Sequence, residues 1–483
     1  MKTINNLEGF GPAGFNDDRV IIQGFYWESY RHGHEKFENS YGSKRWYDIV
    51  AEQAQTLNEA RFDLIWLPPP FYAGQHSAGY NPKEYFNFNN SYGNFDQHRR
   101  MLETLLNNGV EPMADVVINH RDGTTRWEDF KNPTWGTWSI QEDDEAFRDK
   151  RSSVYGLLYH KRGLPELPTE YRPVTYSYGD FRDIDHTCHI VRRDVIKALL
   201  SLRSLGYRGW RYDMIHGFPA RYIRLYNKMS MPSFSVGEYD WDKQAEKRGW
   251  VFYTSIEGGT VETSSNVFDF NTFFTLKNRQ GAYRDLYYPF GLTTDSTDNI
   301  PWKNRAVTFA ENHDTGYRTN EDLTPQENHQ FDSFQNGWPI EQAYAYLLTH
   351  PGIPCVFWKH YFDWGQDLQM KIKALINARK VAGVNAGSTV YFHENARFAG
   401  VYGAQVDGSN TSLFVRIGGQ DNDWNPTMSG FNSIREYARG QEWCVWIGQE
   451  NPNEFINAPL KEALPIPDFQ QPTSIVVEEE QLY

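Results

Sequence analysis

The stretch Gly209-Trp210-Arg211-Tyr212-Asp213-Met214 decides how the chain can fold. It is short, largely apolar and opens with glycine, which predicts a buried β-strand. Residues two apart on a strand point to the same side, so Arg211 and Asp213 share one face. An arginine and a carboxylate on a buried face are costly unless they have a partner or a chemical task. The stretch therefore predicts a strand that carries reactive groups at its end.

Three other apolar runs also end in polar, ionisable residues. They are Asp115-Val-Val-Ile-Asn119-His120, Ser235-Val-Gly237-Glu238 and Phe309-Ala-Glu-Asn312-His313-Asp314. Parallel strands with reactive residues at one common end are typical of a (β/α)8 barrel, whose active site lies at the carboxyl ends of its strands. We therefore interpret the four runs as barrel strands that deliver side chains to one face.

Strand and helix patterns alternate along the rest of the chain. Apolar runs predict further strands at 20–25, 63–68, 266–270 and 352–358, and helical spacing predicts helices at 45–60, 95–108, 189–205, 218–229, 242–255, 340–348 and 367–381. The fold class is therefore α/β, and residues 1–118 with 188–384 are expected to close into a (β/α)8 barrel.

Two regions depart from this alternation. Residues 119–187, rich in aromatic residues, proline and glycine, have little helical period and are expected to form an inserted subdomain after the third strand. Residues 385–483 contain short apolar runs punctuated by Gly, Asn and Asp, which predicts a C-terminal antiparallel β-sandwich. The role of the tail from 451 is open, with 473–478 as a candidate edge strand.

Composition excludes several classes of function. The 483 residues carry a net charge of −14, which argues against a nucleic-acid partner and against an anionic membrane surface. No apolar run reaches the roughly 18 residues that span a bilayer. The 16 Trp, 30 Tyr and 31 Phe fit either a large core or a cleft whose rings stack on sugars.

Cysteine usage and the first residues bear on the setting of the protein. Cys188, Cys355 and Cys444 are odd in number and far apart, so buried structural thiols are expected rather than disulfides or a metal site. Residues 1–8 lack the apolar core of a signal peptide. We expect a monomer that is cytoplasmic, or secreted or periplasmic if a signal was removed.

Asp213, Glu238 and Asp314 stand at the ends of three predicted barrel strands. Each alone fits a solvated capping residue, but three at neighbouring strand ends favour a catalytic site. Cleaving a glycosidic bond takes two carboxyl groups, one ionised to attack the sugar and one that donates a proton to the leaving oxygen. Arg211 is expected to lower the pKa of Asp213 and keep it ionised, which leaves Glu238 as the proton donor.

Two further groups of residues are candidates for ligand binding. His120 and His313 also follow strands and are expected to hydrogen-bond sugar hydroxyls. Asn119, Asp183 and Asp185 supply amide and carboxylate oxygens, the donors that a hard cation such as calcium takes.

Together these stretches resemble the α-amylases of glycoside hydrolase family 13, most of all the plant and archaeal type. The resemblance rests on seven stretches in family order between about 20 and 385: Gln23-Gly-Phe-Tyr-Trp-Glu-Ser29, Asp115-Val-Val-Ile-Asn-His-Arg121, Asp183-Ile-Asp-His186, Gly209-Trp-Arg-Tyr-Asp213, Val236-Gly-Glu-Tyr239, Asn312-His-Asp-Thr-Gly316 and Phe362-Asp-Trp-Gly365. One such stretch is modest evidence, whereas the ordered set is specific.

The resemblance implies an endo-acting, retaining enzyme that hydrolyses α-1,4-glucosidic bonds in starch, glycogen or maltooligosaccharides. It implies Asp213 as nucleophile, Glu238 as general acid/base and Asp314 as transition-state stabiliser. The implied sugar-binding residues are Tyr80, His120, Arg211, His313, His216 and Trp241, and the implied ligands of a structural calcium ion are Asn119, Asp183 and the backbone carbonyl of Gly217.

The sequence leaves alternatives open and departs from the family pattern in places. The alternatives are an α-glucan transglycosylase or maltogenic enzyme on the same fold, and a non-catalytic glucan-binding protein. The departures are Asp240 before Trp241, Ile215 before His216, and Glu311 where aspartate is commoner. We expect these positions on the leaving-group side of the cleft, where they would affect chain-length preference.

Overall fold

The computed structural model covers residues 1–483 and describes most of them. The described residues are 15–34, 41–123, 129–141, 181–239, 243–258, 260–278, 283–287, 291–293, 300–320, 324–326, 338–393, 400–421, 423–427, 433–449 and 457–482. Of the expected inserted subdomain, 124–128 and 142–180 lie outside this set, so its extent stays a prediction.

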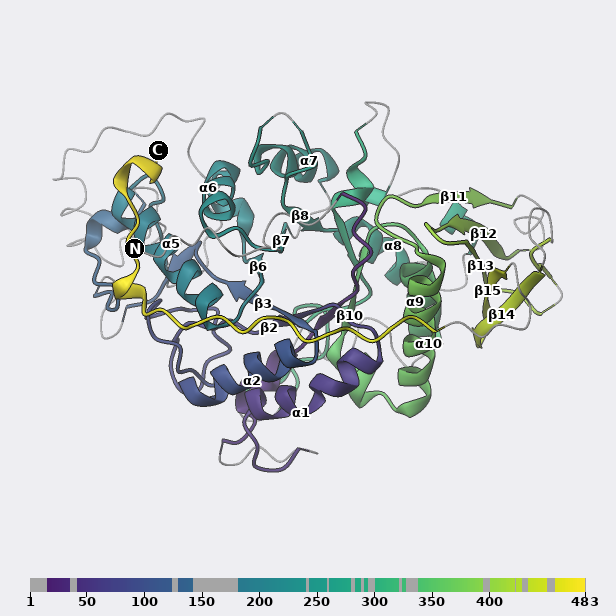
Figure 1. Ribbon diagram of the computed structural model, residues 1–483, viewed down its shortest axis with the longest axis horizontal. Helices are drawn as coiled ribbons and strands as arrows, with labels where there is room; N and C mark the ends of the chain where they lie inside the picture. Colours follow the sequence, from purple (N-terminus) through teal and green to yellow (C-terminus); the bar gives the residue numbers. More distant parts are fainter. Residues whose placement is uncertain are drawn as a thin grey trace.

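Eight parallel strands of the described residues close into a barrel, which confirms the expected fold (Figure 1). The strands are β1 (Ile21–Gln23), β2 (Leu64–Leu67), β3 (Glu111–Val116), β6 (Gly209–Tyr212), β7 (Phe234–Gly237), β8 (Asn266–Phe268), β9 (Ala306–Phe309) and β10 (Ile353–Phe357). Their residues are buried apart from Glu111, which is half-buried, as expected for a parallel sheet covered by helices. The pairing of β1 with both β2 and β10 closes the ring.

Helices follow the strands along the chain. They are α1 (Trp46–Glu59), α2 (Phe95–Asn107), α5 (His189–Leu205), α6 (Ala220–Ser230), α7 (Gln244–Tyr253), α8 (Phe270–Asn278), α9 (Trp338–Thr349) and α10 (Gln366–Ala382). α2 shows why they form: Asn94 and Gln97 make a capping box at its start, and Met101 and Leu105 belong to a buried apolar stripe. The sequence pattern missed α8, which follows β8 almost without a loop.

The inserted segment leaves and rejoins the barrel at one place. The strand β4 (His120–Arg121) pairs antiparallel with β5 (Arg182–Asp183), so that His120 stands opposite Asp183. Residues about sixty apart in sequence are therefore neighbours beside the carboxyl end of β3.

The C-terminal part contains a five-stranded antiparallel sheet in the order β11-β12-β13-β15-β14 (Figure 1). Its strands are β11 (Thr389–Phe392), β12 (Tyr402–Asp407), β13 (Ser412–Ile417), β14 (Ser433–Gly440) and β15 (Trp443–Gln449). Helices α9 and α10 of the barrel contact strands β13 and β15. The sheet is therefore joined to the barrel through a shared apolar core.

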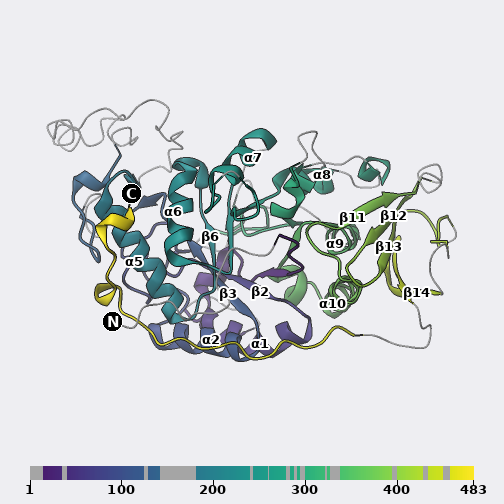
Figure 2. The same ribbon diagram turned by 45° about the horizontal axis from the view of Figure 1, so that its top comes forward.

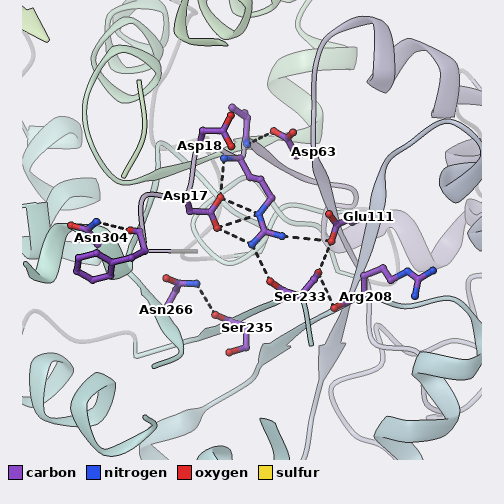
Figure 3. Close-up of polar contacts among 12 residues, drawn as sticks. Asp17, Asp18, Asp63, Glu111, Arg208, Ser233, Ser235, Asn266 and Asn304 are labelled. Carbon is purple, nitrogen blue, oxygen red and sulfur yellow. Dashed lines mark hydrogen bonds and ion pairs between the residues drawn. The ribbon is translucent and has the colours of Figure 1, made fainter. Parts of the chain in front are cut away.

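A polar network joins the amino ends of the barrel strands (Figure 3). Arg19 contacts Asp17 at 2.8 Å and Glu111 at 3.6 Å, and it donates to the carbonyl oxygen of Ser233 at 3.0 Å. The buried Asp63 pairs with Lys380 at 2.8 Å on the same side. In barrels of this type the amino ends of the strands serve stability and the carboxyl ends serve chemistry.

The segment 457–482, here called the C-terminal strap, begins against α10 and runs along the barrel past α1 and α2 to α5 (Figures 1 and 2). Lys461 pairs with Asp63, and the Leu464 amide donates to the carbonyl oxygen of Leu106 at 2.8 Å. The candidate edge strand at 473–478 is wrong. That part begins as a 3-10 turn, Pro472–Ser474, which packs against α5 because its apolar residues complete the barrel's surface instead of the sheet.

No helix in the described part of the chain has both the length and the apolarity that crossing a membrane requires.

Two adjacent valines test whether the strap is docked in solution. Val477 is 8% exposed and Val476 is 76% exposed. We expect Val477→Ala to lower the free energy of unfolding by about 1–3 kcal/mol, because it removes buried apolar volume. Val476→Ala should leave that free energy unchanged, and denaturant titration measures both. Equal effects of the two substitutions would contradict the docked strap.

Candidate active site

Asp213 and Glu238 follow the neighbouring strands β6 and β7 directly, and the local backbone brings their side chains together. Met214 adopts a left-handed conformation, with φ of 43°, so the chain turns sharply after Asp213. The turn lets the Met214 amide donate to Glu238 Oε2 at 3.3 Å. At Gly237 a Cβ atom would come within 2.5 Å of the rigid ring of Trp250, which favours glycine just before Glu238.

One guanidinium group contacts three carboxyl groups. Arg211 Nη1 lies 2.7 Å from Asp115 Oδ1 and 2.7 Å from Asp213 Oδ1. Its Nη2 lies 2.8 Å from Glu238 Oε1, an ion pair whose alignment is too poor for a hydrogen bond. The expected pairing of Arg211 with Asp213 is therefore present, and Glu238 joins it. We call Arg211, Asp115, Asp213 and Glu238 the carboxylate cluster.

Aromatic groups fix the deepest member of the carboxylate cluster. Asp115 Oδ2 accepts from the Tyr80 hydroxyl at 2.8 Å and from Trp66 Nε1 at 3.1 Å. The guanidinium of Arg211 lies 4.8 Å from the centre of the Trp66 ring, in a cation–π contact. Arg211 is thus clamped by an indole face and by carboxylates, and its orientation is set by packing.

Burial controls the protonation of the carboxylate cluster. It raises the pKa of Asp115 to about 6 and the pKa of Asp213 well above its usual range, while the positive charge of Arg211 opposes both shifts. The negative charges of neighbouring carboxylates push the pKa of Asp213 further up. The expectation that Arg211 makes the pKa of Asp213 low is therefore wrong, because burial and two like charges outweigh one cation.

Three parallel rings lie beside the carboxylate cluster. Tyr80 and His313 have ring centres 5.2 Å apart and planes 7° apart, and Trp27 is parallel to both. Burial and the nearby Arg211 lower the pKa of His313 well below its usual value, so the ring is neutral. The side-chain amide of Gln23 donates to His313 Nδ1 at 2.8 Å, which leaves the proton of the neutral ring on Nε2.

Asp314 lies at the exposed side of this group. Its backbone amide donates to Asn312 Oδ1 at 2.9 Å, and one carboxylate oxygen lies 3.2 Å from His313 Nε2. Side-chain exposure rises from 1% at Arg211 through 7% at Asp213 and 11% at Glu238 to 40% at Asp314. The group is therefore open to solvent on the side of Asp314.

The remaining predicted sugar-binding residues are placed unevenly. His120 is buried and bonded to the carbonyl oxygen of Tyr80 at 2.6 Å, and burial lowers its pKa to about 4. The contact that the structure shows for Nε2 of His120 is with the backbone of Tyr80. A contact between His120 and a sugar stays a prediction. The half-buried His216 lies against Tyr239, whose ring centre is 5.9 Å away. Trp241 lies outside the described residues.

The three predicted calcium ligands converge. The pairing of His120 with Asp183 places Asp183 beside Asn119, whose carbonyl oxygen accepts from the Ile184 amide at 2.9 Å. A Cβ atom at Gly217 would lie 1.8 Å from Asn119 Oδ1, so only glycine lets these groups meet. The donor set of an amide oxygen, a carboxylate and a backbone carbonyl fits a hard cation. No cluster of three or more His, Cys, Asp or Glu side chains occurs among the described residues.

The structure corrects the interpretation of Glu311. Its side chain is fully buried, and Oε2 lies 3.0 Å from His360 Nε2 on the short helix that follows β10. Tyr344 on α9 contacts the other ring nitrogen of His360 at 2.8 Å. Glu311 therefore braces the packing outside the barrel and does not line a cleft.

Several residues of the site were not singled out from the sequence. Asp115 was quoted only as the start of a strand. Its pairing with Arg211 became visible through the register of β3 with β6. Gln23 ends the first strand and Trp27 follows it, and both lie in the quoted stretch Gln23–Ser29, which is the signal that could have found them. A cavity of about 700 Å³ lies elsewhere, between α6, the loop after α7 and the C-terminal strap, and none of the site residues lines it.

Known families match both parts of the chain. Residues 35–222 match the family described as the α-amylase catalytic domain, and residues 381–447 match the α-amylase C-terminal β-sheet domain. A solved α-amylase from Geobacillus thermoleovorans, complexed with acarbose, superposes with a TM-score of 0.60 at 14% identity, covering 90% of this chain and 98% of that one. That likeness supports the fold alone.

Curated relatives extend over nearly the whole chain. Probable α-amylase 2 of Arabidopsis thaliana is 28% identical over 468 residues, which span 92% of this chain and 97% of that protein. The glucan 1,4-α-maltotetraohydrolase of Stutzerimonas stutzeri is 30% identical over 457 residues, which span 89% of this chain and 73% of that protein. Likeness of this extent, with matches to both domain families, shows that the chain belongs to the α-amylase family, family 13 of the glycoside hydrolases.

Proposed function

We propose that this protein is a retaining, endo-acting α-amylase that hydrolyses α-1,4-glucosidic bonds in starch-like glucans. The observation that carries the proposal is the carboxylate cluster, in which Asp213 and Glu238 contact the same guanidinium within 2.8 Å. Two carboxyl groups side by side, next to rings on which a sugar can stack, are what a retaining glycosidase needs.

The proposed reaction has two steps. Asp213 attacks the anomeric carbon while Glu238 gives its proton to the departing glycosidic oxygen, so that a glycosyl ester forms and the first glucan fragment leaves. Glu238 then takes a proton from water, the water oxygen attacks the same carbon, and Asp213 is released. Two inversions retain the configuration. Asp314 would accept hydrogen bonds from the sugar as positive charge develops on it.

The relatives differ in the product that their names state. Two of them are named α-amylases of Arabidopsis thaliana and two are named glucan 1,4-α-maltotetraohydrolases. Product sizes from amylose decide between these patterns. A broad range of oligosaccharide sizes among the early products supports endo action. Maltotetraose as the main early product would instead show that the enzyme releases units of four glucoses.

A structural calcium ion is part of the proposal. Asn119, Asp183 and the Gly217 carbonyl would hold it beside the paired strands β4 and β5, where it would tie the inserted segment to the barrel. Gly217 lies four residues after Asp213, so the ion would also fix the turn that carries the nucleophile.

Substitution of the two central carboxyl groups tests the reaction. We expect Asp213→Asn and Glu238→Gln each to lower kcat on amylose by about a thousandfold or more, since each removes a group that forms or breaks a bond. Asp367→Asn, on an aspartate whose side chain is 82% exposed on α10, is the matched control and should be neutral. Release of reducing ends measures all three. Near-normal turnover in either active-site variant refutes the assignment.

Asp115 should affect the pH dependence of the rate. The nucleophile must be ionised, and the negative charge of Asp115 raises the pKa of Asp213. The acid limb of kcat/KM should therefore lie above the usual pKa of an aspartate. Asp115→Asn removes that charge, lowers the pKa of Asp213 and should move the acid limb to lower pH. An acid limb that stays in place or moves to higher pH contradicts this electrostatic account.

Calcium binding should appear in thermal stability. A ligand that binds the folded state at a hundred times its Kd adds about 2.7 kcal/mol, so a chelator should lower the Tm of the wild-type protein by several degrees. Asp183→Asn should reduce the response to chelator, whereas Asp367→Asn should keep it. A wild-type Tm that is the same with chelator and with added calcium rules out the proposed ion.

A further inference from the structure

Arg318 lies four residues after Asp314 in the loop that follows β9. Its guanidinium forms an ion pair with Asp314 Oδ1, and its Nε donates to the carbonyl oxygen of His313 at 2.9 Å. The same guanidinium lies 3.8 Å from the centre of the Trp27 ring, on the loop after β1. Only 12% of the side chain is exposed. Arg318 therefore has three anchors on two loops and is held in one orientation.

Both carboxylate oxygens of Asp314 have close partners. Oδ1 contacts Arg318, and Oδ2 lies 3.2 Å from His313 Nε2. Gln23 donates to the other nitrogen of His313, so the neutral ring carries its proton on Nε2, the nitrogen that lies beside Asp314. The direction in which the Asp314 carboxylate points is thus set by the ion pair with Arg318 at one oxygen and by the His313 ring beside the other.

The loop that carries Arg318 is separately anchored. The Thr319 amide donates to Glu28 Oε1 at 2.6 Å, and Arg31 Nη1 donates to Thr319 Oγ1 at 2.9 Å. Glu28 and Arg31 belong to the short helix η1 (Trp27–Arg31) after β1. The backbone near Asp314 therefore keeps its place without Arg318, and the pairing with Arg318 acts on the Asp314 side chain itself.

Two arginines divide the carboxylates of the site between them. Among the described residues, Arg211 contacts Asp115, Asp213 and Glu238, whereas Arg318 contacts Asp314. A carboxylate that is 40% exposed is free to rotate unless a partner holds it, and a misdirected group loses much of its effect on a transition state.

We infer that Arg318 is a positioning residue for the reaction: it holds the Asp314 carboxylate in the direction from which it meets the sugar. The inference rests on the proposed function. It adds a residue that neither the catalytic pair nor the predicted sugar-binding set contains, and it gives the loop after β1 a task through Trp27, the platform on which Arg318 lies.

The experiment measures kcat and KM of the full-length protein on a maltooligosaccharide. We expect Arg318→Ala to lower kcat about tenfold or more with KM within about threefold, since substrate still binds while Asp314 is no longer held. Millimolar guanidinium ion should restore part of the kcat of this variant, and Arg318→Lys should fall between it and the wild type. A kcat for Arg318→Ala within about twofold of wild type overturns the inference.

A double-mutant cycle separates positioning from loop stability. Arg318→Ala in an Asp314→Asn background should cost little further kcat, because the group that Arg318 positions is already gone. Thr319→Ala is the matched control, since it removes side-chain bonds to Arg31 and Glu28 and leaves Arg318 with Asp314. A loss from Thr319→Ala as large as that from Arg318→Ala, or additive losses in the cycle, would show loop anchoring and overturn the inference.

The wild-type protein distinguishes this inference from the proposed function. If wild type releases reducing sugar and Arg318→Ala keeps pace with it, only the inference fails. If wild type releases none under conditions in which it is folded by circular dichroism, the proposed function fails and the inference fails with it.

Discussion

The site depends on one buried positive charge shared among three carboxyl groups. Arg211 cannot neutralise Asp115, Asp213 and Glu238 together, and burial makes the uncompensated negative charge costly. The raised pKa values of Asp115 and Asp213 express that cost as a readiness to hold protons. The proposed nucleophile Asp213 must be ionised to react, so the same crowding of buried carboxylates that is electrostatically costly also sets the pH above which the site can work.

The two ends of the barrel differ in how well their charges are matched. At the amino ends of the strands, Arg19 pairs with Asp17 and Glu111, and Asp63 pairs with two lysines, so charges there are matched. At the carboxyl ends negative charge is in excess. The aromatic packing around Arg211 and the strands β3, β6 and β7 hold that excess in place, which a loop-built site of the same composition would not do.

The sequence predicted the barrel well because its signals are local. Buried parallel strands have continuous apolar runs in the sequence, and the helices between them have apolar residues at helical spacing. Strand and helix positions therefore followed from the periodicity of apolar residues. The same logic placed Arg211 and Asp213 on one face of one strand. It could not show Asp115 opposite Arg211, because the register between two neighbouring strands is a property of the assembled sheet. The Arg318–Trp27 contact joins segments far apart in sequence and likewise depends on the assembled barrel.

Predictions from local sequence patterns were wrong where tertiary packing decided the position or the protonation of a residue. Glu311 follows a strand as Asp213 does, yet it faces His360 outside the barrel. The segment 473–478 has strand-like alternation, yet it begins in a 3-10 turn that packs against α5, and its Ile475 and Val477 are buried without joining the sheet. Sequence also gave the wrong sign for the pKa of Asp213, because the extent of burial and the number of neighbouring charges are properties of the assembled barrel.

The C-terminal strap has a consequence for how the protein is made. A ribosome releases the chain from its amino end, so the helices α1 and α2 emerge long before the residues that cover them. During that interval Asp63 lacks its contact with Lys461, and the surfaces beneath the strap face solvent. The nascent chain therefore carries an unfinished barrel throughout the synthesis of the residues before the strap, and residues 457–482 can seal it only after every element that they cover has been made.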